Sequence, residues 1–195
     1  YYADQVFPIL TPLAVDPGHP FPYISTLSLN LGLLIVDPHS GVRRFARVKV
    51  PVDLLSRHLP IGDKAVQLEQ VISANLDKLF PGVEIIERTV FRVTRDADIA
   101  VTADMLDDHD DDLMTAVESE LRQRRFGEVV RVEIRSAATP ELRNILASEL
   151  GIEHDVFFDV DGRVDLSSYG NIDKLVHGRA GFSLKPVSPR TPDEF

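Results

Sequence analysis

The 195-residue sequence contains no cysteine and no tryptophan. Without cysteine the chain has no disulfides, thiolate zinc ligands or cysteine nucleophiles, which fits a reducing compartment, and we expect a cytoplasmic location. No apolar run approaches the roughly 18 to 20 residues needed to cross a bilayer, so we expect no membrane span. The first residues show neither an initiator Met nor a signal peptide, and we expect the chain to be a section of a longer protein.

Several catalytic and ligand-binding motifs are also missing. The sequence has no GxxxxGK[ST] or GxGxxG loop to cradle a phosphate, no GxSxG elbow, and no HxH or HExxH pair to hold a metal ion. The net charge of −10 should repel nucleic acid and other polyanions unless basic residues gather locally. We therefore expect no nucleic-acid partner, and neither cofactor nor metal bound by this chain itself.

What is present is the composition of an ordinary globular domain, with 44% hydrophobic and 27% charged residues. A chain of this length suits a single domain with a sizeable core. Five prolines between Pro8 and Ile24 predict an ordered, extended segment rather than a helix. Leu27 to Val36 then alternates apolar and polar positions, which predicts a half-buried strand around which the rest packs.

The remaining elements follow from periodicity and from turn residues. We predict a hairpin pairing 27–36 with 43–50, a helical turn over 52–59, a helix over 67–80, one or two strands over 83–95, a long helix over 104–126, a strand over 129–135, a hairpin over 156–166 across Asp161 and Gly162, and a short helix over 166–176. Thr139 as N-cap, Pro140 at N1 and Gly151 at the C-terminus delimit one more helix. The predicted fold class is α+β: a single domain with a mixed, largely antiparallel sheet and flanking helices.

Four sequence words carry a family resemblance: FPILTPLAVDPGHPFPYISTLSLNL from Phe7, FARVKVP from Phe45, LFPG from Leu79 and FRVTRDADI from Phe91. In this order and spacing they resemble bacterial polyphosphate kinases. The resemblance implies a middle, or head, domain over 1–178, including a proline-rich N-terminal segment at 1–26. Residues 179–195 would be a proline-punctuated tail or linker toward C-terminal catalytic domains.

The same resemblance implies an activity for the parent enzyme: reversible transfer of the terminal phosphate of ATP to polyphosphate through a phosphohistidine, with Mg²⁺. The phosphorylated histidine and its partner lie in the family's C-terminal domains, and no position here matches them. We therefore assign no catalytic residue to this chain and expect it to be inactive alone. The implied role is to support packing with the other domains of its polypeptide and formation of a homo-oligomer.

The strongest candidates for a site are Arg92, Arg95, Asp96 and Asp98, clustered at the end of a predicted strand. Arginine there can grip a phosphate of polyphosphate or pair with a carboxylate from a neighbouring domain. The alternative is an Asp-capped turn with ion pairs inside the chain. A second basic group is interpreted as a helix-end and strand-face pattern; it comprises Arg122, Arg124, Arg125, Arg131 and Arg135.

Other functional readings stay open. His19, held between prolines in GHPFP, would serve a free-standing phosphate-handling enzyme such as a phosphohistidine phosphatase, against the alternative of a packed turn histidine. The acidic run at 107–112 offers oxygen ligands for a divalent cation, but adjacent helix positions point in different directions, which favours a solvated face. A binding module without chemistry is the third reading.

Overall fold

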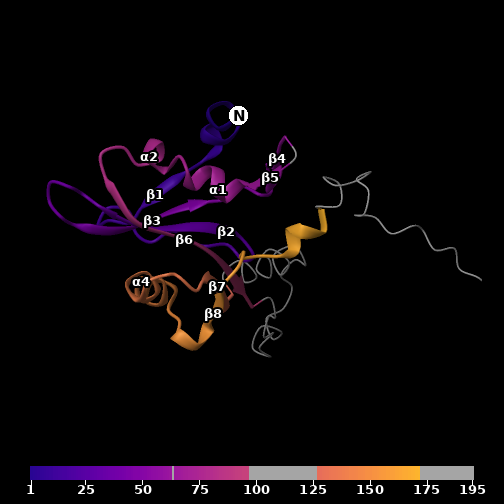
Figure 1. The fold of residues 1–195 in the computed structure, drawn as a ribbon. Coiled ribbons are helices and arrows are strands. Elements are labelled where there is room, and N and C mark those ends of the chain that lie inside the picture. Colours follow the sequence, from indigo (N-terminus) through magenta and orange to yellow (C-terminus); the bar gives the residue numbers. More distant parts are fainter. Residues whose placement is uncertain (63, 97–126, 172–195) are drawn as a thin grey trace, which may run out of the picture.

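The computed structural model describes residues 1–62, 64–96 and 127–171 (Figure 1). Their main sheet has six strands in the order β1-β3-β2-β6-β7-β8. These strands are β1 (Pro12–Ala14), β2 (Leu29–Val36), β3 (Arg43–Lys49), β6 (Glu84–Arg95), β7 (Val129–Arg135) and β8 (Phe157–Val160). All neighbours are antiparallel except β7 and β8. A separate hairpin pairs β4 (His58–Ile61) with β5 (Lys64–Gln67). The predicted α+β class with a mixed, largely antiparallel sheet is confirmed.

Helices cover both faces of this sheet (Figure 1). On one face lie α1 (Leu68–Ser73), α2 (Leu76–Leu79) and the N-terminal turns η1 (Tyr2–Val6) and η2 (Phe7–Ile9). On the other face lies α4 (Pro140–Leu150), which connects β7 to the parallel strand β8. Short turns η4 (His154–Val156) and η5 (Ser167–Asn171) flank β8 along the chain. Hydrophobic cores therefore form on both sides of the sheet.

Strand β2 lies between the two cores. Leu31 and Leu33 pack on the α1 face, whereas Leu34 packs on the α4 face. A Cβ on Gly32 would lie 3.2 Å from the ring of Phe91 and 3.3 Å from that of Phe45, so glycine makes room for both aromatic rings. The prediction that this strand is only half-buried is wrong, because helices and aromatic rings cover both of its faces.

The elements with clear end signals are confirmed. The hairpin of β2 and β3, the strand β7 and the helix α4 all form where predicted, and β6 is one continuous strand. The Thr139 hydroxyl accepts a hydrogen bond from the Leu142 amide at 3.3 Å, and Gly151 adopts a φ of 65° at the C-terminus of α4. The helix predicted over 67–80 is present, but it is interrupted at Ala74 and Asn75 to give α1 and α2.

Three local predictions differ from the structure. Of the helical turn predicted over 52–59, only a single turn forms, in which the amides of Leu54 and Leu55 donate to the carbonyl of Pro51, and His58 and Leu59 pair with β5 instead. The hairpin over 156–166 does not form, because β8 instead pairs in parallel with β7 and no strand follows it up to residue 171. The proline-rich segment is not extended throughout, since Phe7–Ile9 is a 3₁₀ turn. The helix predicted over 104–126 and most of that over 166–176 lie outside the described residues.

Candidate functional site

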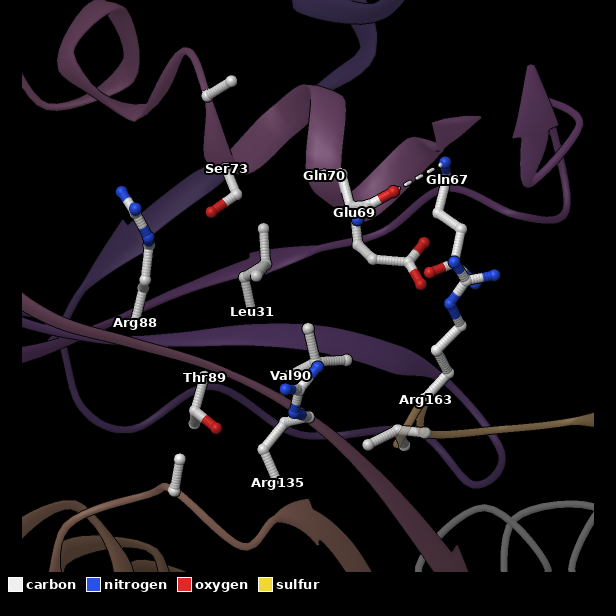
Figure 2. Close-up of a pocket in the computed structure, with 13 residues that line it drawn as sticks. Leu31, Gln67, Glu69, Gln70, Ser73, Arg88, Thr89, Val90, Arg135 and Arg163 are labelled. Carbon is white, nitrogen blue, oxygen red and sulfur yellow. Dashed lines mark hydrogen bonds between the residues drawn. The ribbon is translucent and has the colours of Figure 1, made fainter. Parts of the chain in front are cut away.

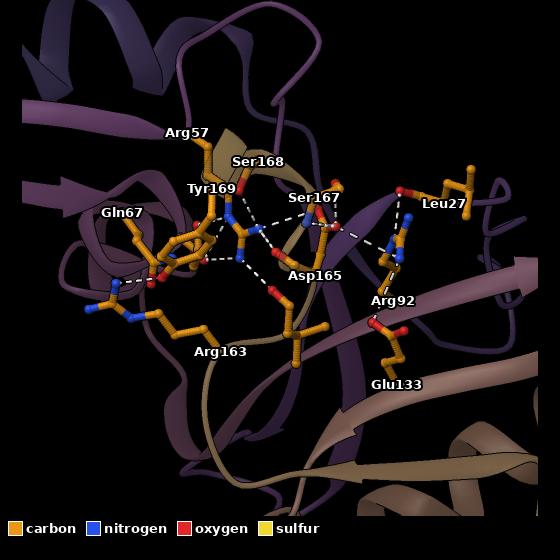
Figure 3. Close-up of polar contacts among 12 residues, drawn as sticks. Leu27, Arg57, Gln67, Arg92, Glu133, Arg163, Asp165, Ser167, Ser168 and Tyr169 are labelled. Atoms are coloured by element: carbon orange, nitrogen blue, oxygen red, sulfur yellow. Dashed lines mark hydrogen bonds and ion pairs between the residues drawn. The ribbon is translucent and has the colours of Figure 1, made fainter. Parts of the chain in front are cut away.

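The Arg92 side chain, at the end of β6, is held by contacts with other residues of this chain (Figure 3). Its side chain projects on the α1 face, directly across from Glu133 of β7. Nη1 lies 3.7 Å from a carboxylate oxygen of Glu133 and 3.7 Å from one of Asp165, and Nε donates to the carbonyl of Leu27 at 3.4 Å. Two carboxylates therefore already balance this guanidinium.

Arg95 holds the end of β6 to two other segments. Its Nε donates to the carbonyl of Ile24 at 2.9 Å, and Nη1 donates to the carbonyl of Gly127 at 2.9 Å. The guanidinium also lies 4.7 Å from the centre of the Tyr23 ring. These contacts fix the proline-rich segment against the sheet.

Asp96 is exposed, and its amide donates to the carbonyl of Glu128 at 2.8 Å. Asp98 lies outside the described residues. The structure thus brings Arg92, Arg95 and Asp96 to one end of β6, and contact of this group with a neighbouring domain or a phosphate polymer stays a prediction.

A buried polar network lies beside Arg92 (Figure 3). Arg57 is 4% exposed, and its guanidinium donates to Glu69 at 2.6 Å, to the carbonyl of Val164 at 2.6 Å and to Ser168 Oγ at 3.0 Å. Nη1 also donates to the carbonyl of Asp165 at 2.5 Å. Sequence reasoning missed this network, since Arg57 lies more than a hundred residues before Val164 and Ser168 along the chain.

A cleft of about 410 Å³ opens between α1 and the α1 face of the sheet. We call it the arginine cleft, because Arg88 of β6, Arg135 of β7 and Arg163 line it (Figure 2). Leu31 and Val90 form its floor. Arg135 was interpreted from the sequence as part of a strand-face pattern, whereas Arg88 and Arg163 were missed. The signal for Arg88 was its place two positions before Val90, which puts both side chains on one face of β6. Its meeting with Arg135 depends on strand pairing.

A smaller pocket of about 270 Å³ lies beside Arg92. Two of its three arginines are paired. Arg131 Nε lies 3.1 Å from Glu133, the same carboxylate that faces Arg92, and the Arg131 guanidinium stacks 4.0 Å from the centre of the Phe158 ring. The third, Arg163, also lines the arginine cleft. Two carboxylates, Glu133 and Asp165, therefore offset most of the positive charge in this pocket, in contrast to the arginine cleft.

The described histidines have distinct surroundings. His19 is exposed, and its Nδ1 lies 3.1 Å from Asp16, where the hydrogen bond from His19 holds the pKa of the Asp16 carboxyl below its ordinary value. A catalytic role for His19 stays a hypothesis. His58 is buried with its Nε2 unpartnered, and burial lowers the pKa of its imidazole, with Arg57 lowering it further.

Within the described ranges, no group of three or more His, Asp or Glu side chains is placed to hold a metal ion. The acidic run at 107–112 lies outside these ranges. None of the described helices is both long and apolar enough to span a membrane.

Comparisons with known proteins agree on one family. The family model for the polyphosphate kinase middle domain matches residues 1–172. The polyphosphate kinase of Thermosynechococcus vestitus is 48% identical over 176 residues, covering 86% of this chain and 24% of that protein. The polyphosphate kinase of Mycolicibacterium gilvum is 42% identical over 203 residues, covering 100% of this chain and 27% of that protein. The chain thus spans about a quarter of the length of these relatives.

A solved structure shows the same fold. The crystal structure of polyphosphate kinase from Porphyromonas gingivalis superposes with a TM-score of 0.69 and 18% identity, covering 97% of this chain and 26% of that one. At this level of identity the likeness shows the fold alone.

Proposed function

The chain belongs to the polyphosphate kinase family, in which it corresponds to the middle domain, and from this membership we propose that it is the non-catalytic support of an ATP:polyphosphate phosphotransferase. The parent enzyme would pass the terminal phosphate of ATP to polyphosphate and back through a phosphohistidine. Such chemistry needs an activated imidazole and cations that clamp the transferred group. Because ATP is the donor, a cytoplasmic location is part of the proposal.

We assign the chemistry to the rest of the parent polypeptide. The described residues offer no group of carboxylates or imidazoles that fits Mg²⁺. His19, the one histidine considered as a catalyst, faces solvent beside Asp16 and does not line the arginine cleft. In this proposal no step of phosphoryl transfer is assigned to the domain.

The observation that carries the supporting role is the apolar surface of the N-terminal segment. Tyr1, Phe7, Ile9 and Leu13 are all exposed large apolar side chains. Leu13 belongs to β1, which ends the strand order and has no partner on its outer edge in the part of the chain that the structure describes. Exposed apolar side chains beside an open strand edge are typical of an interaction surface. Since the relatives are about four times as long as this chain, the other domains of the same polypeptide are the proposed occupant.

Hydrogen exchange tests this packing role. We expect amides of residues 1–14 to exchange more slowly in the full parent enzyme than in the 195-residue chain, because the neighbouring domains cover them. Amides of the β2–β3 turn around Gly41, which is exposed and distant from this segment in sequence, serve as the internal control. Equal exchange of residues 1–14 in both proteins would rule out packing through this segment.

An activity assay tests the division of labour. Purified parent enzyme should synthesise polyphosphate from ATP and Mg²⁺, whereas the 195-residue chain should neither make the polymer nor consume ATP. Synthesis by the chain alone would overturn the non-catalytic role. Hydrolysis of a generic phosphoester by the chain, abolished in His19→Ala, would instead support the phosphatase reading.

A further inference from the structure

We propose that the arginine cleft binds a linear oligophosphate through Arg88, Arg135 and Arg163. The choice of ligand rests on the proposed function, while the cleft itself is defined by side chains of the described residues. The proposal adds a polymer-binding surface to a domain so far given only a supporting role.

The first argument is the lack of charge compensation. Among the described residues, Arg88 and Arg135 make no hydrogen bond or ion pair through their side chains, although both are exposed. Arg163 donates only to the Tyr169 hydroxyl, at 2.5 Å, and meets no carboxylate in the part of the chain that the structure describes. In a chain with a net charge of −10, carboxylates are plentiful, yet none within the described ranges forms an ion pair with these three cations.

The second argument concerns the one acid that lines the cleft. Glu69 is 5% exposed, and both of its carboxylate oxygens accept hydrogen bonds from Arg57 Nε, at 3.1 and 3.3 Å. A carboxylate engaged in this way has little capacity left for a second guanidinium. The lining therefore carries three positive charges against an acid already neutralised inside the protein.

The third argument is the placement of the cations. Phe91 of β6 pairs with Ile134 of β7, so continuing the register sets Arg135 across from Val90 and diagonal to Arg88. Diagonal neighbours on paired strands lie about 7 to 8 Å apart, which is within joint reach of two long side chains on one ligand. Figure 2 shows Arg163 at the opposite end of the cleft, beside Gln67. Like charges placed this closely repel each other, and an anion lying along the cleft relieves that repulsion.

The lining also distinguishes between polyanions. Among the described residues no aromatic side chain lines the cleft, so these residues offer no stacking platform for a nucleobase. Guanidinium groups bind phosphate oxygens in a bidentate manner, and the Ser73 hydroxyl, which has no partner in the described chain, adds a donor from α1. These features favour a chain of phosphates without bases over a nucleotide or nucleic acid.

Isothermal titration calorimetry with the 195-residue chain tests the proposal, with tripolyphosphate and a longer linear polyphosphate as probes. The variant Arg88→Gln/Arg135→Gln should bind both probes at least about tenfold more weakly, since a hydrogen bond to a charged group contributes about 1.5 to 3 kcal/mol. The salt dependence of binding should also become shallower, because fewer counterions are released. ATP should bind no more tightly than tripolyphosphate.

Arg44→Gln is the matched control, because Arg44 on β3 is also exposed, makes no side-chain hydrogen bond or ion pair within the described ranges and does not line the cleft. Its affinity should stay within about twofold of the unaltered chain. Circular dichroism confirms that each variant is folded. Unchanged affinity in the double variant, an equal loss in Arg44→Gln, or no binding by the unaltered chain would each overturn the proposal.

Failure of this inference and failure of the proposed function can be told apart. If the parent enzyme makes no polyphosphate while the double variant loses tripolyphosphate binding, the proposed function is wrong and the cleft remains an oligophosphate site. If the parent enzyme makes polyphosphate while the double variant binds as before, the cleft assignment is wrong and the proposed function stands.

Discussion

Arg57 is the residue that ties the chain after β8 to the rest of the fold. Its three nitrogen atoms donate to Glu69 at the start of α1 and to the segment from Val164 to Ser168. A buried guanidinium is stable only when all of its N–H donors have acceptors. Here backbone carbonyl oxygens accept from the donors that the carboxylates do not engage. The path of residues 164–168 therefore depends on a side chain more than a hundred residues earlier.

The first residue-scale prediction concerns this pair. Glu69→Ala should lower the free energy of unfolding by about 3 to 5 kcal/mol, because it leaves Arg57 charged, buried and short of an acceptor. Urea denaturation measures the change. Removing both charges in Arg57→Met/Glu69→Leu should cost less than the sum of the two single variants, whereas simple additivity would show that the two side chains are not coupled.

The second residue-scale prediction concerns pH. Burial and Arg57 lower the pKa of His58, against an opposing effect of Glu69, while Arg163 lowers it further. The unfolded imidazole, with a pKa of about 6.5, then binds a proton that the folded one does not, so stability should fall as pH drops below about 6.5. Urea midpoints at about pH 8 and about pH 5.5 measure this loss.

His58→Phe supplies the control for that experiment, because it keeps an aromatic ring beside Tyr169, whose ring centre lies 5.0 Å from that of His58. The variant should lose less stability between the two pH values than the unaltered chain. An identical loss in both proteins would assign the pH dependence to groups other than His58. Asp16 does not contribute between these pH values, because its lowered pKa places its titration in more acidic solution.

At the scale of elements, the N-terminus of α4 shows how a helix start is fixed from both sides. The Thr139 hydroxyl accepts from the Leu142 amide, while Glu87 of β6 accepts from the Thr139 amide at 2.8 Å and from its hydroxyl at 2.5 Å. Thr139→Ala should therefore cost about 1 to 2 kcal/mol of stability, measured by urea denaturation. Thr139→Ser retains the hydroxyl and should cost less; equal losses would show that the cap contributes nothing.

Helices and strands were predictable where the residues that specify them lie close together in the sequence. The alternation in β7 and the cap residues of α4 lie within a few positions of each other, and both elements form at the expected residues. The segment around His58 was misread because its strand is specified by pairing with β5 and by the burial of Arg57, which a helical pattern of leucines does not reveal. The hairpin predicted over 156–166 does not form for a similar reason, namely a contact with a distant residue. Asp165 adopts a φ of 59° where Arg57 donates to its carbonyl.

The candidate sites were likewise predictable only where their residues lie close together in the sequence. Arg92 and Arg95 were singled out from one sequence word, and their side chains do gather at one end of β6. Their acceptors, which include Leu27, Ile24 and Gly127, come from other segments and could not be inferred from that word. The arginine cleft was missed for the same reason, because its three cations come from three separate segments.

At the scale of the whole molecule, the domain presents two kinds of surface. The arginine cleft lies between α1 and the sheet, whereas exposed apolar side chains line the N-terminal segment and the open edge at β1. A domain that both contacts its neighbours and holds part of a polymer would need the two surfaces to be separate. Homo-oligomer formation belongs to the same proposal. Light scattering of the full parent enzyme tests it, and a strictly monomeric enzyme would count against a subunit contact.

The last prediction separates packing between domains from folding of this domain. Phe7 and Ile9 are 41% and 38% exposed in η2, so Phe7→Ser/Ile9→Ser should change the melting temperature of the 195-residue chain little. In the parent enzyme the same change should lower the temperature at which this domain unfolds, because each covered side chain contributes about 1.5 to 3 kcal/mol when fully buried. Val42→Ser, at 46% exposed in the β2–β3 turn, is the control and should have no such effect. An equal change in both proteins would mean that η2 serves only the fold of its own domain.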